Sequence, residues 1–250
     1  MNIRNLYKLF LKYPKICTDS RSVIKDSIFF ALSGDNFNGN KFAKQAIENG
    51  CAYAITDDEQ YSNHQNIILV QDSLKTLQEL AKYHRKKLNI PFIGITGTNG
   101  KTTSKELIHA ILSSQYKTHA TKGNLNNHIG VPLSILETNN KTEISIIEMG
   151  ANHQNEINLL SNIAQPNYGI ITNIGRAHLK GFGNIEGVIK AKSELYTYIK
   201  KNKQQIFLNQ DDKTLVELAK GIKHNTYGTK ANTSGLLLEN NLFTEVKYKN

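Results

Sequence analysis

Two kinds of hydrophobic spacing alternate along the chain and predict an α/β protein. Residues 91–96 are almost continuously apolar, which is typical of a buried strand. Apolar residues then recur at helical spacing, at Leu107, Ile108, Ile111 and Leu112. Between the two lies the glycine-rich stretch 97–103, GTNGKTT. Strand, glycine turn and helix in this order predict a cradle in which backbone N–H groups approach an anion at a helix N-terminus.

The same spacing rules predict elements along the rest of the chain. A helix is expected over 3–11 and a helical face over 42–47, ended by Gly50, with strands over 27–32, 52–55 and 67–70. A helix capped by Asp72 or Ser73 is expected to run to 84–87. Further strands are expected over 143–149, 168–174 and 205–208, and a helix opens at Asn184. Strands that alternate with helices favour a mostly parallel sheet.

The length of the chain and the position of Pro91 predict two domains. We expect a small N-terminal α/β substrate domain over 1–85 and a central domain of the P-loop type over 86–250, with Pro91 just before its first strand.

The composition argues against a membrane protein and against a secreted one. The chain has no apolar run long enough for a membrane span, and its opening residues lack the features of a signal peptide. Cys17 and Cys51 show no metal or redox spacing and are interpreted as reduced residues. A cytoplasmic protein without a membrane partner is therefore expected.

The formal net charge of +10 raises nucleic-acid binding as an alternative. Few of the basic residues are arginines, and the lysines are scattered rather than clustered with aromatic residues. This pattern favours a lysine-rich surface around sites for nucleotides and other small anions, and no nucleic-acid partner.

The stretch 97–103 carries residue types that handle phosphate. Lys101 can neutralise phosphate oxygens, and the Thr102 hydroxyl is placed to bind Mg²⁺. The match to the P-loop pattern is imperfect, because its first glycine would fall at Ile95 whereas glycines stand at 94 and 97. The alternative is a glycine turn that only joins a strand to a helix.

Three further residues break the local pattern of the second domain. Glu148 ends an apolar strand, where parallel sheets place ligand sites, so it is either a Mg²⁺ ligand or an ordinary strand-end acid. His178 lies in a loop after the next strand, and position alone does not distinguish a ligand from a surface histidine. Lys192 falls in the apolar stripe of the helix from Asn184, so it is paired, modified, or snorkelling past the core.

The stretch 97–103 resembles the ATP-binding signature of the Mur ligases, the ATP-dependent amide-bond-forming enzymes of peptidoglycan precursor synthesis. Longer stretches are similar to the member of that family that joins D-Ala-D-Ala to UDP-MurNAc-tripeptide. They are FALSGDNFNG (30–39), GNLNNHIGVP (123–132), IEMGANHQ (147–154), AHL (177–179), GFG (181–183) and KAKSEL (190–195). The similarity covers almost the whole chain in the family's order.

The resemblance implies catalytic and ATP-binding roles. ATP binding is implied for Gly97, Thr98, Asn99, Gly100, Lys101, Thr102 and Thr103. Thr102 and Glu148 would hold one Mg²⁺ ion and His178 a second. Lys192 matches a lysine that becomes an N-carbamate, an anion that can bind metal. Lys101, Glu148, His178 and Lys192 would be the catalytic residues.

The resemblance also implies two groups of substrate-binding residues. The UDP end would be held by Asp19, Ser20, Arg21, Gly34, Asn36 and Phe37, and the phosphates or peptide by Asn126, Asn127, Asn152 and His153. ATP would phosphorylate the terminal carboxylate of the UDP-MurNAc-tripeptide, and the D-Ala-D-Ala amine would displace phosphate from the acyl phosphate. A monomer is expected.

The chain departs from the family pattern at three places. Asn155 stands where glycine is usual, and Lys180 where an acid is common. Family members continue into a Rossmann-like C-terminal domain, so we expect this chain to be incomplete and inactive by itself. Two alternatives stay open: the family member that adds the third peptide residue, and a nucleotide-binding module without ligation chemistry.

Overall fold

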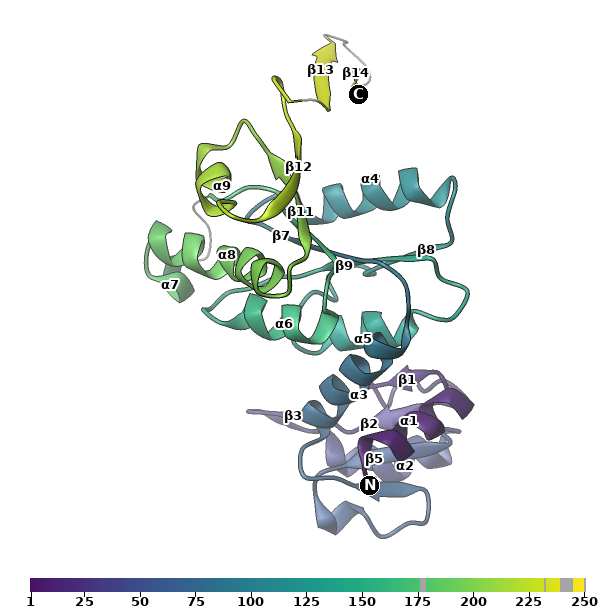
Figure 1. The fold of residues 1–250 in the computed structure, drawn as a ribbon. Helices are drawn as coiled ribbons and strands as arrows, with labels where there is room; N and C mark the ends of the chain where they lie inside the picture. The colour runs from purple at the N-terminus through teal and green to yellow at the C-terminus, as the bar shows by residue number, and fades with distance from the viewer. Residues whose placement is uncertain (176–178, 232, 239–244, 250) are drawn as a thin grey trace. The chain divides into compact units, whose positions relative to one another are not determined.

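The computed structural model describes residues 1–175, 179–231, 233–238 and 245–249 (Figure 1). The chain forms two compact units. Unit 1 comprises Met1–Asn89 and His128–Asn140, and unit 2 comprises Ile90–Asn127 and Lys141–Asn250. Helix α5 (Gly130–Glu137) lies within the range expected for the second domain, but it packs on α3 (Ser73–Lys87) in unit 1.

Unit 1 is built on a parallel sheet with strand order β1-β2-β5-β6. These strands are β1 (Ile16–Cys17), β2 (Ile28–Phe30), β5 (Tyr53–Thr56) and β6 (Ile67–Leu69). The remaining elements are α1 (Ile3–Lys12), η1 (Gly39–Phe42), α2 (Ala43–Glu48), η2 (Glu59–Tyr61) and the hairpin of β3 (Ser33–Gly34) with β4 (Phe37–Asn38). The predicted strands and helices of this region are confirmed, with ends that differ by a few residues.

Side-chain spacing and caps explain the helices of unit 1. Helix α1 buries Leu6 and Phe10, which lie one turn apart. The Asp72 carboxylate caps α3 by accepting a hydrogen bond from the Lys75 amide at 2.7 Å, and the basic last turn of α3 opposes the negative end of the helix dipole. Cys17 and Cys51 are free, buried thiols of this core.

Unit 2 contains a six-stranded parallel sheet in the order β12-β11-β10-β7-β9-β8. Its strands are β7 (Phe92–Thr96), β8 (Thr118–Ala120), β9 (Ile144–Glu148), β10 (Tyr168–Ile171), β11 (Gln205–Asn209) and β12 (Lys223–Tyr227). Its helices are α4 (Lys101–Ser113), α6 (Glu156–Ala164), α7 (Leu179–Phe182), α8 (Ile185–Lys201) and α9 (Lys213–Leu218). A hairpin of β13 (Ser234–Leu238) and β14 (Glu245–Lys249) follows.

The sequence predicted the central strands of this sheet and missed its edges. Strands β7, β9, β10 and β11 are confirmed, although β10 ends at Ile171 and not at Ile174. The edge strands β8 and β12 are rich in polar residues, THA and KHNTY, so they carry no strong hydrophobic signal. Helices α4, α6 and α8 cover the sheet, with α4 on the opposite side from α6 and α8 (Figure 1).

Helix α4 buries only part of its apolar face. Ile108 and Leu112 pack on the strands, but Leu107 and Ile111 are 60% and 71% exposed. They border an apolar groove of about 490 Å³ whose floor includes Ile170 and Phe207. The predicted helix is therefore confirmed, while half of its predicted inward stripe faces solvent.

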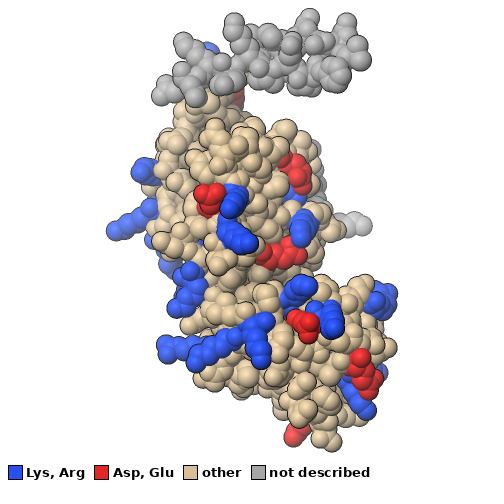
Figure 2. Space-filling view, turned by 90° about the vertical axis from the view of Figure 1, so that its right-hand side faces the viewer, with Lys and Arg blue, Asp and Glu red and all other residues tan. Residues whose placement is uncertain are grey.

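Surface charge follows the scattered pattern of the sequence. On the face drawn in Figure 2, lysines and arginines are spread over several elements, and acidic side chains lie among them. Among the described residues, no helix has the length and apolar character needed to cross a membrane.

A buried histidine makes the stability of unit 1 dependent on pH. His84 of α3 is 6% exposed; its Nε2 donates to the Thr138 carbonyl oxygen at 2.7 Å, and its Nδ1 accepts from the Tyr7 hydroxyl, 3.2 Å away. Burial lowers the pKa of His84 below its ordinary value of about 6.5. The neutral imidazole uses both nitrogens, and a proton on Nδ1 would force the Tyr7 hydroxyl to change from donor to acceptor.

We predict that unit 1 loses stability as the pH falls from about 7 to about 5, since the unfolded chain then binds a proton that folded His84 resists. Urea unfolding measured across this range should show a weaker pH dependence in His84→Gln. The same change at His128, an exposed histidine of unit 1, serves as the control. Equal pH dependence in both variants would contradict the prediction.

Candidate functional site

The glycine-rich turn lies between the central strand β7 and helix α4, as predicted. Gly100 immediately precedes the helix with a φ of +74°, and Gly97 has a φ of +144°. A Cβ atom at position 97 would lie 2.0 Å from the Thr172 Oγ1 atom. Position 97 therefore requires glycine, although the general pattern places its first glycine two residues earlier.

The segment 172–175, which follows β10, holds this turn in place. The Thr98 and Asn99 amides donate to the backbone oxygen and the side-chain oxygen of Asn173 at 3.0 and 3.1 Å. The Thr172 hydroxyl donates to the Asn99 carbonyl oxygen at 2.6 Å, and the Gly175 amide donates to the Thr98 hydroxyl at 2.9 Å. The sequence analysis missed this clamp because it assigned these residues to the strand.

The Lys101 side chain folds back onto the turn that precedes the helix. Its Nζ atom donates to the carbonyl oxygens of Gly97 at 3.0 Å and Thr98 at 2.9 Å. Burial lowers the pKa of Lys101, and the negative charge of Glu148 opposes that shift. Lys101 and Glu148 are thus within electrostatic reach of each other. Thr102 and Thr103 are exposed in the first turn of α4.

Glu148 is buried at the end of β9, with 1% of its surface exposed. Its amide donates to the Thr121 hydroxyl at 3.0 Å, and its Oε1 atom accepts from the Asn126 side chain at 2.9 Å. Its Oε2 atom has no hydrogen-bond partner and lies 4.0 Å from the Nζ atom of Lys105. Lys105, which is completely buried on α4, was missed by the sequence analysis.

The surroundings of Glu148 fit a magnesium ion better than a metal that needs several protein ligands. One buried carboxylate oxygen lacks a hydrogen bond, and Mg²⁺ is usually held by one or two carboxylates together with phosphates and water. Within the described residues, no group of three or more His, Cys, Asp and Glu side chains could hold a metal ion. His178, the predicted second ligand, lies outside the described residues.

Lys192 of α8 points inward, as its position in the apolar stripe predicted. It is 2% exposed, which excludes the snorkelling alternative, and its Nζ atom makes one long hydrogen bond of 3.5 Å, to the Ala151 carbonyl oxygen. Burial, followed by the positive charge of Lys101, lowers the pKa of Lys192 to about 8. Glu156 and Glu194 oppose this shift.

Two carboxylates shape the loop 150–155 that contains Asn152 and His153. Glu156 accepts hydrogen bonds from the amides of Asn152 and His153 at 2.6 and 3.0 Å. Glu194 of α8 accepts from the amides of Asn155 and Asn158 at 2.7 and 2.8 Å, so it caps α6 from a neighbouring helix.

The backbone at Asn155 explains one departure from the family pattern. Its φ is +67°, a left-handed conformation that glycine adopts freely and that asparagine tolerates better than most residues. Asn126, predicted to lie near the phosphates or the peptide, donates a side-chain hydrogen bond to Glu148. Asn127 is exposed.

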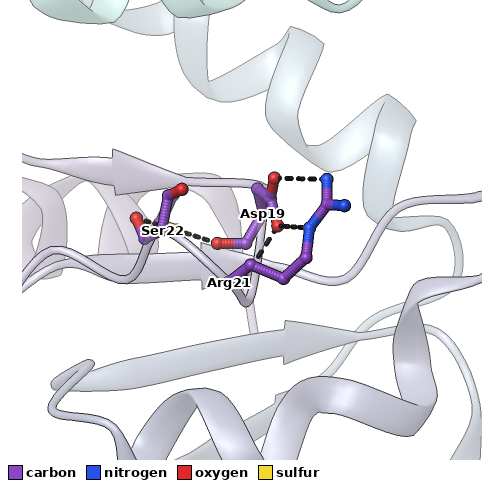
Figure 3. A network of polar contacts seen from close by, with 4 residues as sticks. Asp19, Arg21 and Ser22 are labelled. Carbon is purple, nitrogen blue, oxygen red and sulfur yellow. Dashed lines mark hydrogen bonds and ion pairs between the residues drawn. The ribbon is translucent and has the colours of Figure 1, made fainter.

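The substrate residues predicted in unit 1 fall into two places. The Arg21 guanidinium donates two hydrogen bonds to the Asp19 carboxylate, from Nε at 3.0 Å and from Nη2 at 2.8 Å (Figure 3). This ion pair lowers the pKa of Asp19 to about 2. Gly34, Asn36 and Phe37 line a polar cleft of about 730 Å³, and Phe37 stacks on Phe42. Residues 19–21, all within the described part of the chain, are not among the lining residues of that cleft.

Two family models match the chain. Residues 95–249 match the Mur ligase middle domain, and residues 12–85 match the Mur ligase family catalytic domain. The UDP-N-acetylmuramoyl-tripeptide–D-alanyl-D-alanine ligase of Bacillus subtilis strain 168 is 41% identical over 216 residues, which cover 86% of this chain and 47% of that protein. The chain thus spans about half the length of the curated relatives that it matches.

Solved structures show the same likeness. A crystal structure of MurF from Acinetobacter baumannii has a TM-score of 0.82 and 33% sequence identity. MurF ligase from Thermotoga maritima in complex with ADP has a TM-score of 0.85 and 28% identity. Each match covers 95% of this chain and 56% of the other chain.

We predict that Gly97→Ala lowers the free energy of unfolding by about 3 kcal/mol, because the new methyl group displaces Thr172 and breaks the clamp. Gly123→Ala is the matched control, because its φ is also positive, +52°, but its Cβ would meet no atom within 4 Å. That change should cost about 1 kcal/mol. Urea unfolding and amide exchange at Thr98 and Asn99 measure the difference, and equal losses in the two variants would contradict the clamp.

Proposed function

The chain belongs to the Mur ligase family, and from that premise we propose that it forms the substrate-binding and ATP-binding parts of an ATP-dependent ligase. The reaction proposed is the joining of D-Ala-D-Ala to UDP-MurNAc-tripeptide in peptidoglycan precursor synthesis, the activity named for the relatives. The observation that carries the proposal is that Lys101, which follows the glycine turn, lies within electrostatic reach of both Glu148 at the end of β9 and Lys192 of α8.

At this edge the turn 97–103 would hold the phosphates of ATP. When bound, ATP supplies the phosphoryl group that activates a carboxylate for amide formation. Lys101, now bonded to carbonyl oxygens of its own loop, would turn its ammonium group to the phosphate oxygens. Glu148, with one oxygen free of hydrogen bonds, and the exposed Thr102 hydroxyl would hold Mg²⁺.

Lys192 has the environment needed for carbamate formation. Because its pKa is lowered to about 8, part of the population is a neutral amine at physiological pH. That amine can attack CO₂, forming a C–N bond and releasing one proton, and the product is an anion. The carbamate would then share a second Mg²⁺ ion with His178, and it would remove the repulsion between Lys192 and Lys101.

Unit 1 would bind the UDP end of the substrate. The polar cleft with Gly34, Asn36 and Phe37 offers an exposed aromatic ring beside amide groups, and Asp19, Ser20 and Arg21 form a separate, ordered turn. Asn126, Asn127, Asn152 and His153 belong to unit 2, where they would act near the phosphates or the peptide. The enzyme is proposed to work as a cytoplasmic monomer.

Phosphate release tests the proposed reaction in an enzyme of the relatives' full length that contains this chain. The chain by itself, which we expect to be inactive, serves as the comparison. Release should require both UDP-MurNAc-tripeptide and D-Ala-D-Ala, and it should fall at least about 100-fold in Lys101→Ala. Lys190→Ala, which removes an exposed lysine of α8, should have no effect. Release that depends on a diamino acid and UDP-MurNAc-dipeptide would instead support the ligase for the third residue.

The carbamate on Lys192 predicts a ¹³C NMR signal when the protein is held in labelled bicarbonate. At a fixed CO₂ concentration the signal should grow as the pH rises from about 7 to about 9, since the neutral amine becomes dominant above its pKa of about 8. Lys192→Ala should lack the signal and Lys190→Ala should retain it. In the full-length enzyme, acetate should partly restore activity to Lys192→Ala. If Lys192→Ala is active without acetate, the carbamate has no part in the reaction.

A further inference from the structure

A second lysine of helix α4 is buried beside the proposed metal site. Lys105 lies one turn after Lys101, and none of its side-chain surface is exposed. Burial of an ammonium group is costly unless hydrogen bonds and an opposite charge compensate it. The partners of Lys105 therefore indicate what the residue does.

Three acceptors surround the Nζ atom of Lys105. It donates to the Thr121 carbonyl oxygen at 2.5 Å and lies 2.9 Å from the Glu106 carboxylate, whose side chain is 59% exposed. The third is Glu148 Oε2 at 4.0 Å, and Glu148 is 1% exposed. Glu106 is the nearer carboxylate, and its hydrogen bond to Lys105 lowers the pKa of Glu106. Water screens that exposed pair, whereas Glu148 is the buried carboxylate beside Lys105.

The distance between Lys105 and Glu148 leaves one oxygen of Glu148 available. A separation of 4.0 Å is too long for a hydrogen bond but short enough for strong attraction between buried charges. Asn126 already holds Oε1, so Oε2 keeps its lone pairs while its charge is balanced. This arrangement suits a carboxylate that must stay in place before a cation arrives.

We propose that Lys105 is a positioning residue of the metal site and acts as the internal counter-ion of Glu148. It balances the buried carboxylate while no cation is bound and leaves Oε2 free for Mg²⁺. The metal part of this inference rests on the proposed function, but the charge pair can be measured without metal, nucleotide or substrate.

A double-mutant cycle separates this role from a purely structural one, in which Lys105 only ties α4 to the Thr121 carbonyl. Thermal unfolding is followed without Mg²⁺ in Lys105→Met, Glu148→Gln and the double variant. Lys105→Met should lower Tm by about 10 °C, because it removes the buried positive charge that lies 4.0 Å from a buried carboxylate. In the Glu148→Gln background the same change should cost less than half as much.

Equal losses in the two backgrounds would overturn the counter-ion role and leave only the bond to Thr121. Glu106→Gln is the control for the exposed partner and should change Tm little. If Lys105→Met does not fold, folding of the double variant supports the proposal. Failure of the double variant to fold, while Glu148→Gln folds, contradicts it.

Mg²⁺ alone, without nucleotide, tests the link to the metal site. Millimolar Mg²⁺ should raise the Tm of Lys105→Met more than that of the unchanged protein, because the ion replaces the missing positive charge beside Oε2. Glu148→Gln should show no such rise. If the Tm losses of the double-mutant cycle are coupled but Mg²⁺ does not raise the Tm of Lys105→Met, Lys105 does not belong to a metal site. Failure of the proposed ligase reaction would appear only in the phosphate-release assay.

Discussion

The buried carboxylate of Glu148 imposes the constraint on which the functional edge of unit 2 depends. A charge at the end of a central strand must be balanced from neighbouring elements. Here the Asn126 side chain donates a hydrogen bond to the carboxylate, and the Lys105 ammonium group lies 4.0 Å from it. The requirement extends to the backbone, because a Cβ atom at Gly150 would lie 2.9 Å from the Asn126 side-chain oxygen. Two residues of the polar stretch after β8, Thr121 and Asn126, therefore hold Glu148 in place.

Parallel strand order brings the other functional groups to the same edge. Strands β7, β9 and β10 are neighbours, so the glycine turn, Glu148 and the segment 172–175 all follow their carboxyl ends. Helix α8 adds Lys192, whose pKa responds to the charge of Lys101. Lys101 beside the glycine turn, together with an acid that has one oxygen free of hydrogen bonds, favours an anionic ligand that arrives with a divalent cation, which is the chemistry of ATP with Mg²⁺.

Much of this arrangement could be predicted from the sequence, because local patterns encode it. Apolar runs predicted the central strands, and the stripe of α8 predicted that Lys192 points inward. Contacts between distant segments left no local signal, so the clamp at Asn173, the counter-ion Lys105 and the cap by Glu194 were missed. The edge strands β8 and β12 were missed since their residues are mostly polar. Helix α5 joined unit 1 through packing on α3, which no periodicity predicts.

We propose that this edge of the unit 2 sheet is a nucleotide site organised around Glu148. Titration of the ¹⁵N-labelled chain with ADP, in the presence and absence of Mg²⁺, tests it most directly. If Glu148 organises the site, ADP should shift the amides of 97–103, and further shifts at 148–153 should require Mg²⁺ and disappear in Glu148→Gln. Amide shifts confined to unit 1, or a response to Mg²⁺ that survives in Glu148→Gln, would contradict it.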